Sequence, residues 1–145
     1  MFTRWSDELL TGDEVIDKQH QTIFQRAEEL INSAGNGCTR DQSVTLINYL
    51  EGYYFSHFAA EEALQVKYGD PNHEAHKRAH EALSQRVAQL KEEAAASANP
   101  QGDCVNVMLF MLGWLAEHIG LMDKALARHI RTISSVQRAP VTHPQ

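Results

Sequence analysis

The sequence predicts an all-α fold, an up-down-up-down four-helix bundle with an N-terminal arm. Two observations predict it. The four prolines come late in the chain, and four long stretches free of proline repeat apolar residues at steps of three and four. With 145 residues, the chain has the size of one domain. We expect the bundle domain to span residues 1–134 and a polar, frayed tail to span residues 135–145.

The first two helices have residues typical of helix starts before their apolar stripes. The first is predicted over residues 17–33, with Asp17 as its N-cap. The second is predicted over residues 40–68, with Thr39 as its N-cap. The preceding residues, 1–16, contain a few hydrophobic side chains and are expected to pack on the bundle as the arm.

The last two helices follow a turn and a polar loop. One is predicted over residues 73–96, with Asn72 as its N-cap, and the other over residues 103–133. In the last helix the inward-facing line stops at His118 and restarts at Asp123. Five residues along a straight helix turn a side chain about 140° away from the starting face. A single-turn π-bulge, a feature common at functional sites, would direct both side chains inward.

Composition and charge exclude several classes of protein. The net charge of −6 argues against binding to nucleic acid or to an anionic membrane surface. No apolar run reaches the roughly 18 residues that cross a bilayer, and the N-terminus does not resemble a signal peptide. Cys38 and Cys104 form no CxxC pair, which favours reduced thiols in a cytoplasmic protein over zinc or disulfide chemistry.

Seven ionisable residues fall on lines that should face the core. They are His20, His57, Glu61, His76, His80, His118 and Asp123. Burying one unpaired carboxylate costs several kcal/mol or shifts its pKa, so this group needs a shared partner, which a metal provides. Imidazole and carboxylate without thiolate suit Fe, Mn or Zn. Seven protein ligands are too many for one tetrahedral site, so two metal ions are the smallest number that could use them all.

The order and spacing of these residues resemble the hemerythrin family, specifically the bacterial hemerythrins. The similarity rests on the segment from Thr11 to His20, the run from His57 to Glu62, the pair His76 and His80, and the segment from Trp114 to Asp123. It covers roughly residues 5–131.

The resemblance implies two non-haem irons joined by an oxo or hydroxo bridge. The ligands would be His76, His80 and His118 for one iron, His20 and His57 for the other, and Glu61 and Asp123 for both. The first iron would then have a closed set of six ligands. The second would have five, and its open position is the one at which the family binds O2.

An apolar pocket should surround such an open position and keep water away. The residues expected to line it stand next to the predicted ligands or one turn from them. They are Ile23, Phe58, Trp114, Leu115 and Ile119.

Several polar residues are expected to lie outside the metal site. Gln65 stands where relatives commonly carry Met, and we expect it to face solvent, with a water path as the alternative. Glu117, His129 and His143 are expected at the surface. His73 lies on the third stripe, one turn before the predicted ligands of its helix, and is expected not to be a ligand, with an outer partner of the site as the alternative.

The function expected from the resemblance is reversible O2 binding, for storage, delivery or sensing, rather than an enzymatic reaction. One alternative is a redox enzyme on the same site that reduces peroxide, O2 or nitric oxide. Another is an iron-responsive regulatory module. The expected ligand is O2, or a small anion on the diferric form, and a signalling or oxidase partner stays open.

Overall fold

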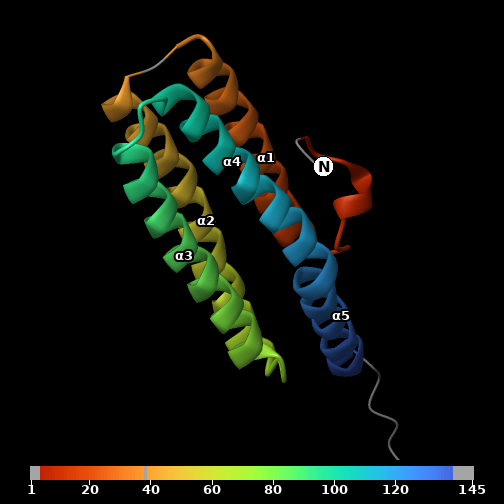
Figure 1. The fold of residues 1–145 in the computed structure, drawn as a ribbon. Coiled ribbons are helices and arrows are strands. Elements are labelled where there is room, and N and C mark those ends of the chain that lie inside the picture. Colours follow the sequence, from red (N-terminus) through yellow and green to blue (C-terminus); the bar gives the residue numbers. More distant parts are fainter. Residues whose placement is uncertain (1–3, 38, 139–145) are drawn as a thin grey trace, which may run out of the picture.

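Helices make up most of the protein. The computed structural model describes residues 4–37 and 39–138, and within them no strand occurs. The helices are η1 (Asp7–Leu9), α1 (Glu14–Gly35), α2 (Arg40–Tyr68), α3 (His73–Ala95), α4 (Pro100–His118), η2 (Ile119–Asp123) and α5 (Lys124–Arg138). Helices α1 to α4 run alternately up and down and pack side by side (Figure 1). The predicted all-α four-helix bundle is confirmed.

Helix α1 begins earlier than predicted. Asp13, not Asp17, is its N-cap, and the Asp13 carboxylate accepts a hydrogen bond from the backbone N–H of Ile16. Asp17 is buried and binds the N-terminal arm instead. Its Oδ1 accepts from the backbone N–H of Thr11 at 2.8 Å and from the Thr11 hydroxyl at 2.7 Å, while its Oδ2 accepts from the N–H of Gly12 at 3.2 Å. The arm is therefore held against the first turn of α1.

Helices α2 and α3 are joined by a tight turn. Thr39 caps α2 as predicted, in a capping box with Gln42. Gly69 ends α2 in the left-handed conformation, at φ +60°. Asn72 precedes the first residue of α3, as predicted, but its side chain makes no capping hydrogen bond. The turn is held by Asp70, whose Oδ1 accepts from the backbone N–H of Asn72 at 3.0 Å.

Helix α4 also begins earlier than predicted. Its first residue is Pro100, and the Asn99 side chain caps it by accepting from the N–H of Gly102. Proline is well tolerated at this position because its missing N–H would have no helical partner there. At the other end, α5 continues to Arg138, so the first part of the expected tail is helical. Residues 139–145 lie outside the described part of the chain.

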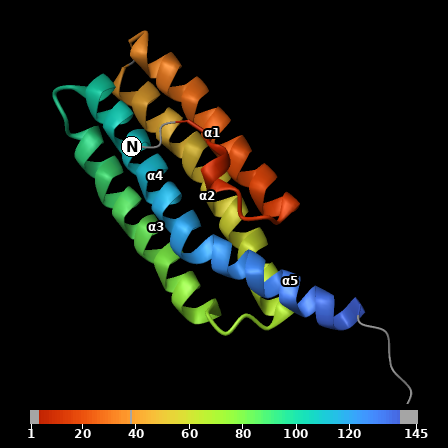
Figure 2. The same cartoon turned by 90° about the vertical axis from the view of Figure 1, so that its right-hand side faces the viewer.

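The π-bulge predicted between His118 and Asp123 is confirmed. Residues Ile119–Asp123 form a π-helix, η2, that joins α4 to α5 without a break. Figure 2 shows the direction of the chain changing where η2 meets α5. The continuous helix from 100 to 137 is long and apolar enough to cross a membrane, but half of its most apolar window is buried inside the bundle, as expected of a core helix.

The apolar core is divided into two parts. The larger part fills the bundle between α1, α2, α3 and α4 and includes Phe24, Leu50 and Leu112. The smaller part consists of Ile16, Leu126 and Ile130, with Leu64 and Tyr68 packed against it. Along α1, α2 and the α4–η2–α5 line, the predicted metal ligands stand between the residues of the two parts. A layer of ionisable side chains thus separates two hydrophobic clusters.

Candidate metal centre

The structure brings all seven predicted ligand residues together inside the bundle. Every one of them is buried, and the most exposed, His118, is only 5% exposed. They come from α1, α2, α3, α4 and η2. Because amphipathic helices turn one stripe inward, residues on five separate elements meet in a single layer. They form two groups that share Glu61.

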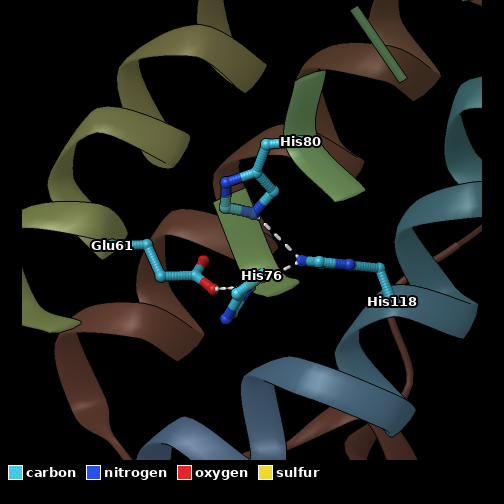
Figure 3. A group of neighbouring side chains, drawn as sticks. All are labelled: Glu61, His76, His80 and His118. Atoms are coloured by element: carbon cyan, nitrogen blue, oxygen red, sulfur yellow. Dashed lines mark hydrogen bonds and ion pairs between the residues drawn. The ribbon is translucent and has the colours of Figure 1, made fainter. Parts of the chain in front are cut away.

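The first group contains three imidazoles and a carboxylate. Figure 3 shows Glu61, His76, His80 and His118 pointing toward one another from three helices. The His118 Nε2 atom lies 2.8 Å from His76 Nε2 and 3.0 Å from His80 Nε2. His76 Nε2 also lies 2.6 Å from Glu61 Oε1. The three ring nitrogens therefore surround one point.

The second group contains two imidazoles and two carboxylates, contributed by His20, His57, Glu61 and Asp123. The Nε2 atoms of His20 and His57 lie 3.0 Å apart. His57 Nε2 lies 2.6 Å from Glu61 Oε2, and His20 Nε2 lies 2.9 Å from Asp123 Oδ2. This group has one imidazole fewer than the first.

Each carboxylate presents one oxygen to each group. Glu61 directs Oε1 to His76 and Oε2 to His57, both at 2.6 Å. Asp123 places Oδ1 3.0 Å from His76 and 3.1 Å from His118, and Oδ2 2.9 Å from His20. This is the arrangement by which two carboxylates bridge two cations.

The geometry of both groups fits metal ions. Two nitrogen ligands at about 2.1 Å from one ion and at right angles to each other are about 3 Å apart, which matches the imidazole spacing. Within the described residues, all four oxygens of Glu61 and Asp123 are buried without a hydrogen bond of good geometry. Buried carboxylate oxygens are rarely left without partners. Cations between the two groups would supply those partners, and the nitrogen and oxygen donors suit iron.

The pKa values in this layer show how strongly its imidazoles and carboxylates interact. Burial by itself would lower the pKa values of His57 and His76, but the neighbouring Asp123 and Glu61 carboxylates outweigh it and raise both to about 9. Burial, together with the positive charges of His118 and His76, lowers the pKa of His80 to about 2. Protons on two imidazoles thus replace some of the positive charge that metals would bring.

Three further polar residues fix the outward-facing nitrogens of the imidazoles. The Nδ1 atoms of His57, His80 and His76 lie 2.7 Å from Gln19 Oε1, 3.1 Å from Glu62 Oε1 and 2.8 Å from Gln65 Nε2. Such outer partners hold a ligating ring in its orientation and tautomer. None of these three contacts was predicted from the sequence. Gln19 and Glu62 each adjoin a predicted ligand, which is the signal that was available.

The sequence prediction for Gln65 was wrong. It was expected to face solvent, but it is fully buried. It follows Glu61 by four residues, so the same helical face that buries Glu61 also buries Gln65.

The five predicted pocket residues surround the layer in two ways. Phe58 stacks on His80, with ring centroids 3.8 Å apart, and Trp114 stacks on His118 at 4.5 Å. The remaining three, Ile23, Leu115 and Ile119, are at most 2% exposed. Ile23 also lines a surface cavity of about 290 Å³ between α1 and α2, whose wall includes His57, Gln19 and Lys18.

The other two histidines in the described part of the chain, His73 and His129, lie outside the layer. His129, expected at the surface, is half-buried, and its Nε2 lies 2.8 Å from the backbone carbonyl oxygen of Tyr68. It therefore ties α5 to the last residue of α2. His73 is half-buried at the start of α3, and Glu117 is exposed as expected. His143 lies outside the described residues.

Comparison with known proteins gives a consistent result. The family model described as "Hemerythrin HHE cation binding domain" matches residues 11–130. Bacteriohemerythrins of Stenotrophomonas maltophilia and Pseudomonas aeruginosa are each 35% identical to this chain over 127 residues, which is 88% of the chain and 80% of the relative. The bacteriohemerythrin of Methylococcus capsulatus is 32% identical over 109 residues, 74% of the chain and 80% of the relative. The chain therefore belongs to the hemerythrin family of non-haem iron-binding proteins.

Proposed function

We propose that the protein binds O2 reversibly at a pair of non-haem irons joined by an oxo or hydroxo bridge. One iron would be held by the three-imidazole group and the other by the two-imidazole group, with Glu61 and Asp123 shared between them. When bound, the irons supply the two electrons that O2 accepts and returns. The observation that supports this proposal best is the inequality of the two groups.

That inequality determines where a ligand can bind. Both groups receive one oxygen from each carboxylate, but the first has three imidazoles and the second has two. With a shared bridge, the three-imidazole group would give its iron six ligands and the two-imidazole group would give its iron five. An open coordination position is what distinguishes a reactive metal site from a structural one. O2 would therefore bind on the His20 and His57 side.

The remaining residues contribute by excluding water and fixing ligand geometry. Leu115 and Ile119 are fully buried, and Ile23 is only 2% exposed, so apolar side chains adjoin the imidazoles on several elements. A dry surrounding limits the proton delivery that would convert bound O2 irreversibly. The side-chain oxygen of Gln19 accepts from His57 Nδ1–H and so leaves Nε2 of that ring available to a metal.

A redox enzyme on the same site is the second candidate. The cavity of about 290 Å³ beside His57 favours it, because it gives a small substrate or water a short approach to the two-imidazole side. Lys18 in its wall would attract small anions.

One titration distinguishes these functions. The purified protein is analysed for iron per chain, reduced without air, exposed to O2 and then freed of O2. Two irons per chain and a visible charge-transfer band that appears with O2 and vanishes on its removal support reversible binding. Immediate, irreversible conversion to the diferric form with turnover of O2 or peroxide supports the enzyme. A chain that holds no iron, or a single zinc ion, contradicts both.

A further inference from the structure

Gln65 occupies a position between the metal layer and the turn that joins α2 to α3. Its side-chain Nε2 lies 2.9 Å from Asp70 Oδ2 and 2.8 Å from His76 Nδ1. Within the described residues, its Oε1 is buried without a hydrogen bond. One amide nitrogen thus contacts two groups, while the oxygen of the same amide contacts none.

A bound cation would change which of these atoms donate and which accept hydrogen bonds. A metal on Nε2 of a neutral imidazole leaves the ring proton on Nδ1, so Nδ1–H becomes a donor. An amide N–H cannot accept from it, whereas the amide oxygen can. Gln65 Oε1 is the acceptor that lacks a partner among the described residues, and the side-chain N–H of Gln65 already has one in Asp70. Both partners now lie beside Nε2, so a full exchange of nitrogen and oxygen would take the N–H away from Asp70. A partial rotation about the side chain's last bond, which is soft, would bring Oε1 toward His76 Nδ1 and keep Nε2 beside Asp70.

We propose that Gln65 is a positioning residue that couples the Asp70 carboxylate to the metal ligand His76. In the metal-loaded protein, the Gln65 oxygen accepts from His76 Nδ1–H while its N–H donates to Asp70. The negative charge of Asp70 polarises the amide, and the amide makes His76 a stronger donor to the cation. The inference rests on the metal site of the proposed function, but it does not depend on O2 binding.

Asp70 is well placed for this role because its carboxylate is fixed. It is 8% exposed, and its other oxygen accepts from the backbone N–H of Asn72 at 3.0 Å. A cavity of about 230 Å³ reaches Asp70 and His76 from the surface between α3 and η2. Gln65, fully buried, therefore links a carboxylate near solvent to an imidazole inside the bundle.

Three variants and a control test the coupling. Gln65→Met keeps the side chain's length and removes its donors, and Asp70→Asn removes the charge while keeping an oxygen for Asn72. The third variant combines both changes. The matched control is Gln89→Met, the same substitution at an exposed position on α3. The metal-free proteins are titrated with Co(II) against a competing chelator, and the visible spectrum of bound Co(II) is recorded.

The expected result is a loss of affinity at one of the two sites. Loss of an outer partner typically weakens metal binding about 10- to 100-fold, and we expect Gln65→Met to fall in this range with an altered Co(II) spectrum. Asp70→Asn should weaken binding less. The double variant should be no weaker than Gln65→Met, because Asp70 acts through Gln65. Gln89→Met should match the wild type in affinity and spectrum.

Two outcomes overturn the proposal. One is a Gln65→Met protein with unchanged Co(II) affinity and spectrum. The other is an Asp70→Asn effect that is just as large in the Gln65→Met background, which would mean that Asp70 acts directly through space. If Gln65→Met does not fold, an unchanged Co(II) spectrum in Asp70→Asn rejects the coupling and an altered spectrum supports it. A wild-type protein that binds two Co(II) ions, but does not bind O2 when it is loaded with iron, would contradict the proposed function and leave the coupling intact.

Discussion

Removing the metal should make the stability of this protein strongly dependent on pH. In the metal-free protein, Asp123 and Glu61 raise the pKa values of His57 and His76 to about 9, against an ordinary value of 6.5. Between these two pH values the folded protein binds protons that the unfolded chain has released. The resulting stabilisation is fully present below pH 6.5 and is lost as the pH rises through 9.

The size of the effect follows from the pKa values. At 1.36 kcal/mol for each pKa unit, a pKa of about 9 in place of 6.5 corresponds to about 3 kcal/mol for one imidazole. His57 and His76 share the same two carboxylates, so their contributions are not additive. We therefore expect the free energy of unfolding to fall by about 3 kcal/mol between pH 6.5 and pH 9.5.

Urea unfolding followed by far-ultraviolet circular dichroism, in the presence of a chelator, measures this loss. The range begins at pH 6.5 because the lowered pKa of His80 destabilises the folded state only below that value. The double variant His57→Gln/His76→Gln should flatten the dependence, because either imidazole alone can keep a proton beside the two carboxylates. His129→Gln, which alters a half-buried histidine outside the layer, should preserve it. A metal-free protein whose stability is constant or rises over this range would refute the reasoning.

Three further changes have expected outcomes. His118→Ala should lower the iron content per chain measured by metal analysis, and His129→Ala should not; equal losses would contradict the ligand assignment. Thr39→Ala should cost about 1 kcal/mol in urea unfolding because the capping box of α2 is lost, and an unchanged midpoint would contradict its role. Leu112→Ala should cost about 2–5 kcal/mol because it leaves a cavity in the fully buried core, and a smaller cost would indicate that the bundle collapses around it.

The bundle was predictable because its signals are local. Helix α2 has the predicted bounds, since the Thr39 cap and the apolar stripe lie within the segment itself. The start of α1 was misplaced because Asp13 and Asp17 are both capable caps. Only the contact of Asp17 with the arm, made through Thr11, shows which of them begins the helix.

The π-helix was predictable for a different reason. Burying His118 or Asp123 costs free energy unless the side chain has a partner, and the partners of both lie inside the bundle. A straight helix would direct the two side chains to different faces. The conflict between residue chemistry and helical period was visible in the sequence, and η2 resolves it.

The outer contacts of the site depend on segments that the sequence alone does not bring together. The burial of Gln65 reflects Asp70 in the following turn and His76 on the next helix. The position of His129 likewise depends on the carbonyl of Tyr68, which closes a helix 61 residues earlier. Each residue alone is polar and gives no sign of its partner, so a surface position was the natural expectation.

The π-helix η2 also determines how the bundle would tolerate a change in chain length. In an ordinary α-helix, four residues turn the chain by about 400° and return a side chain to within about 40° of its starting face. A chain shortened by one residue between His118 and Asp123 would therefore keep Leu126 and Ile130 on the buried line. The aspartate would also stay on that line, four residues after His118, so neither the packing of the bundle nor the inward direction of the aspartate requires the additional residue. The additional residue is thus accommodated by the fold rather than required by it.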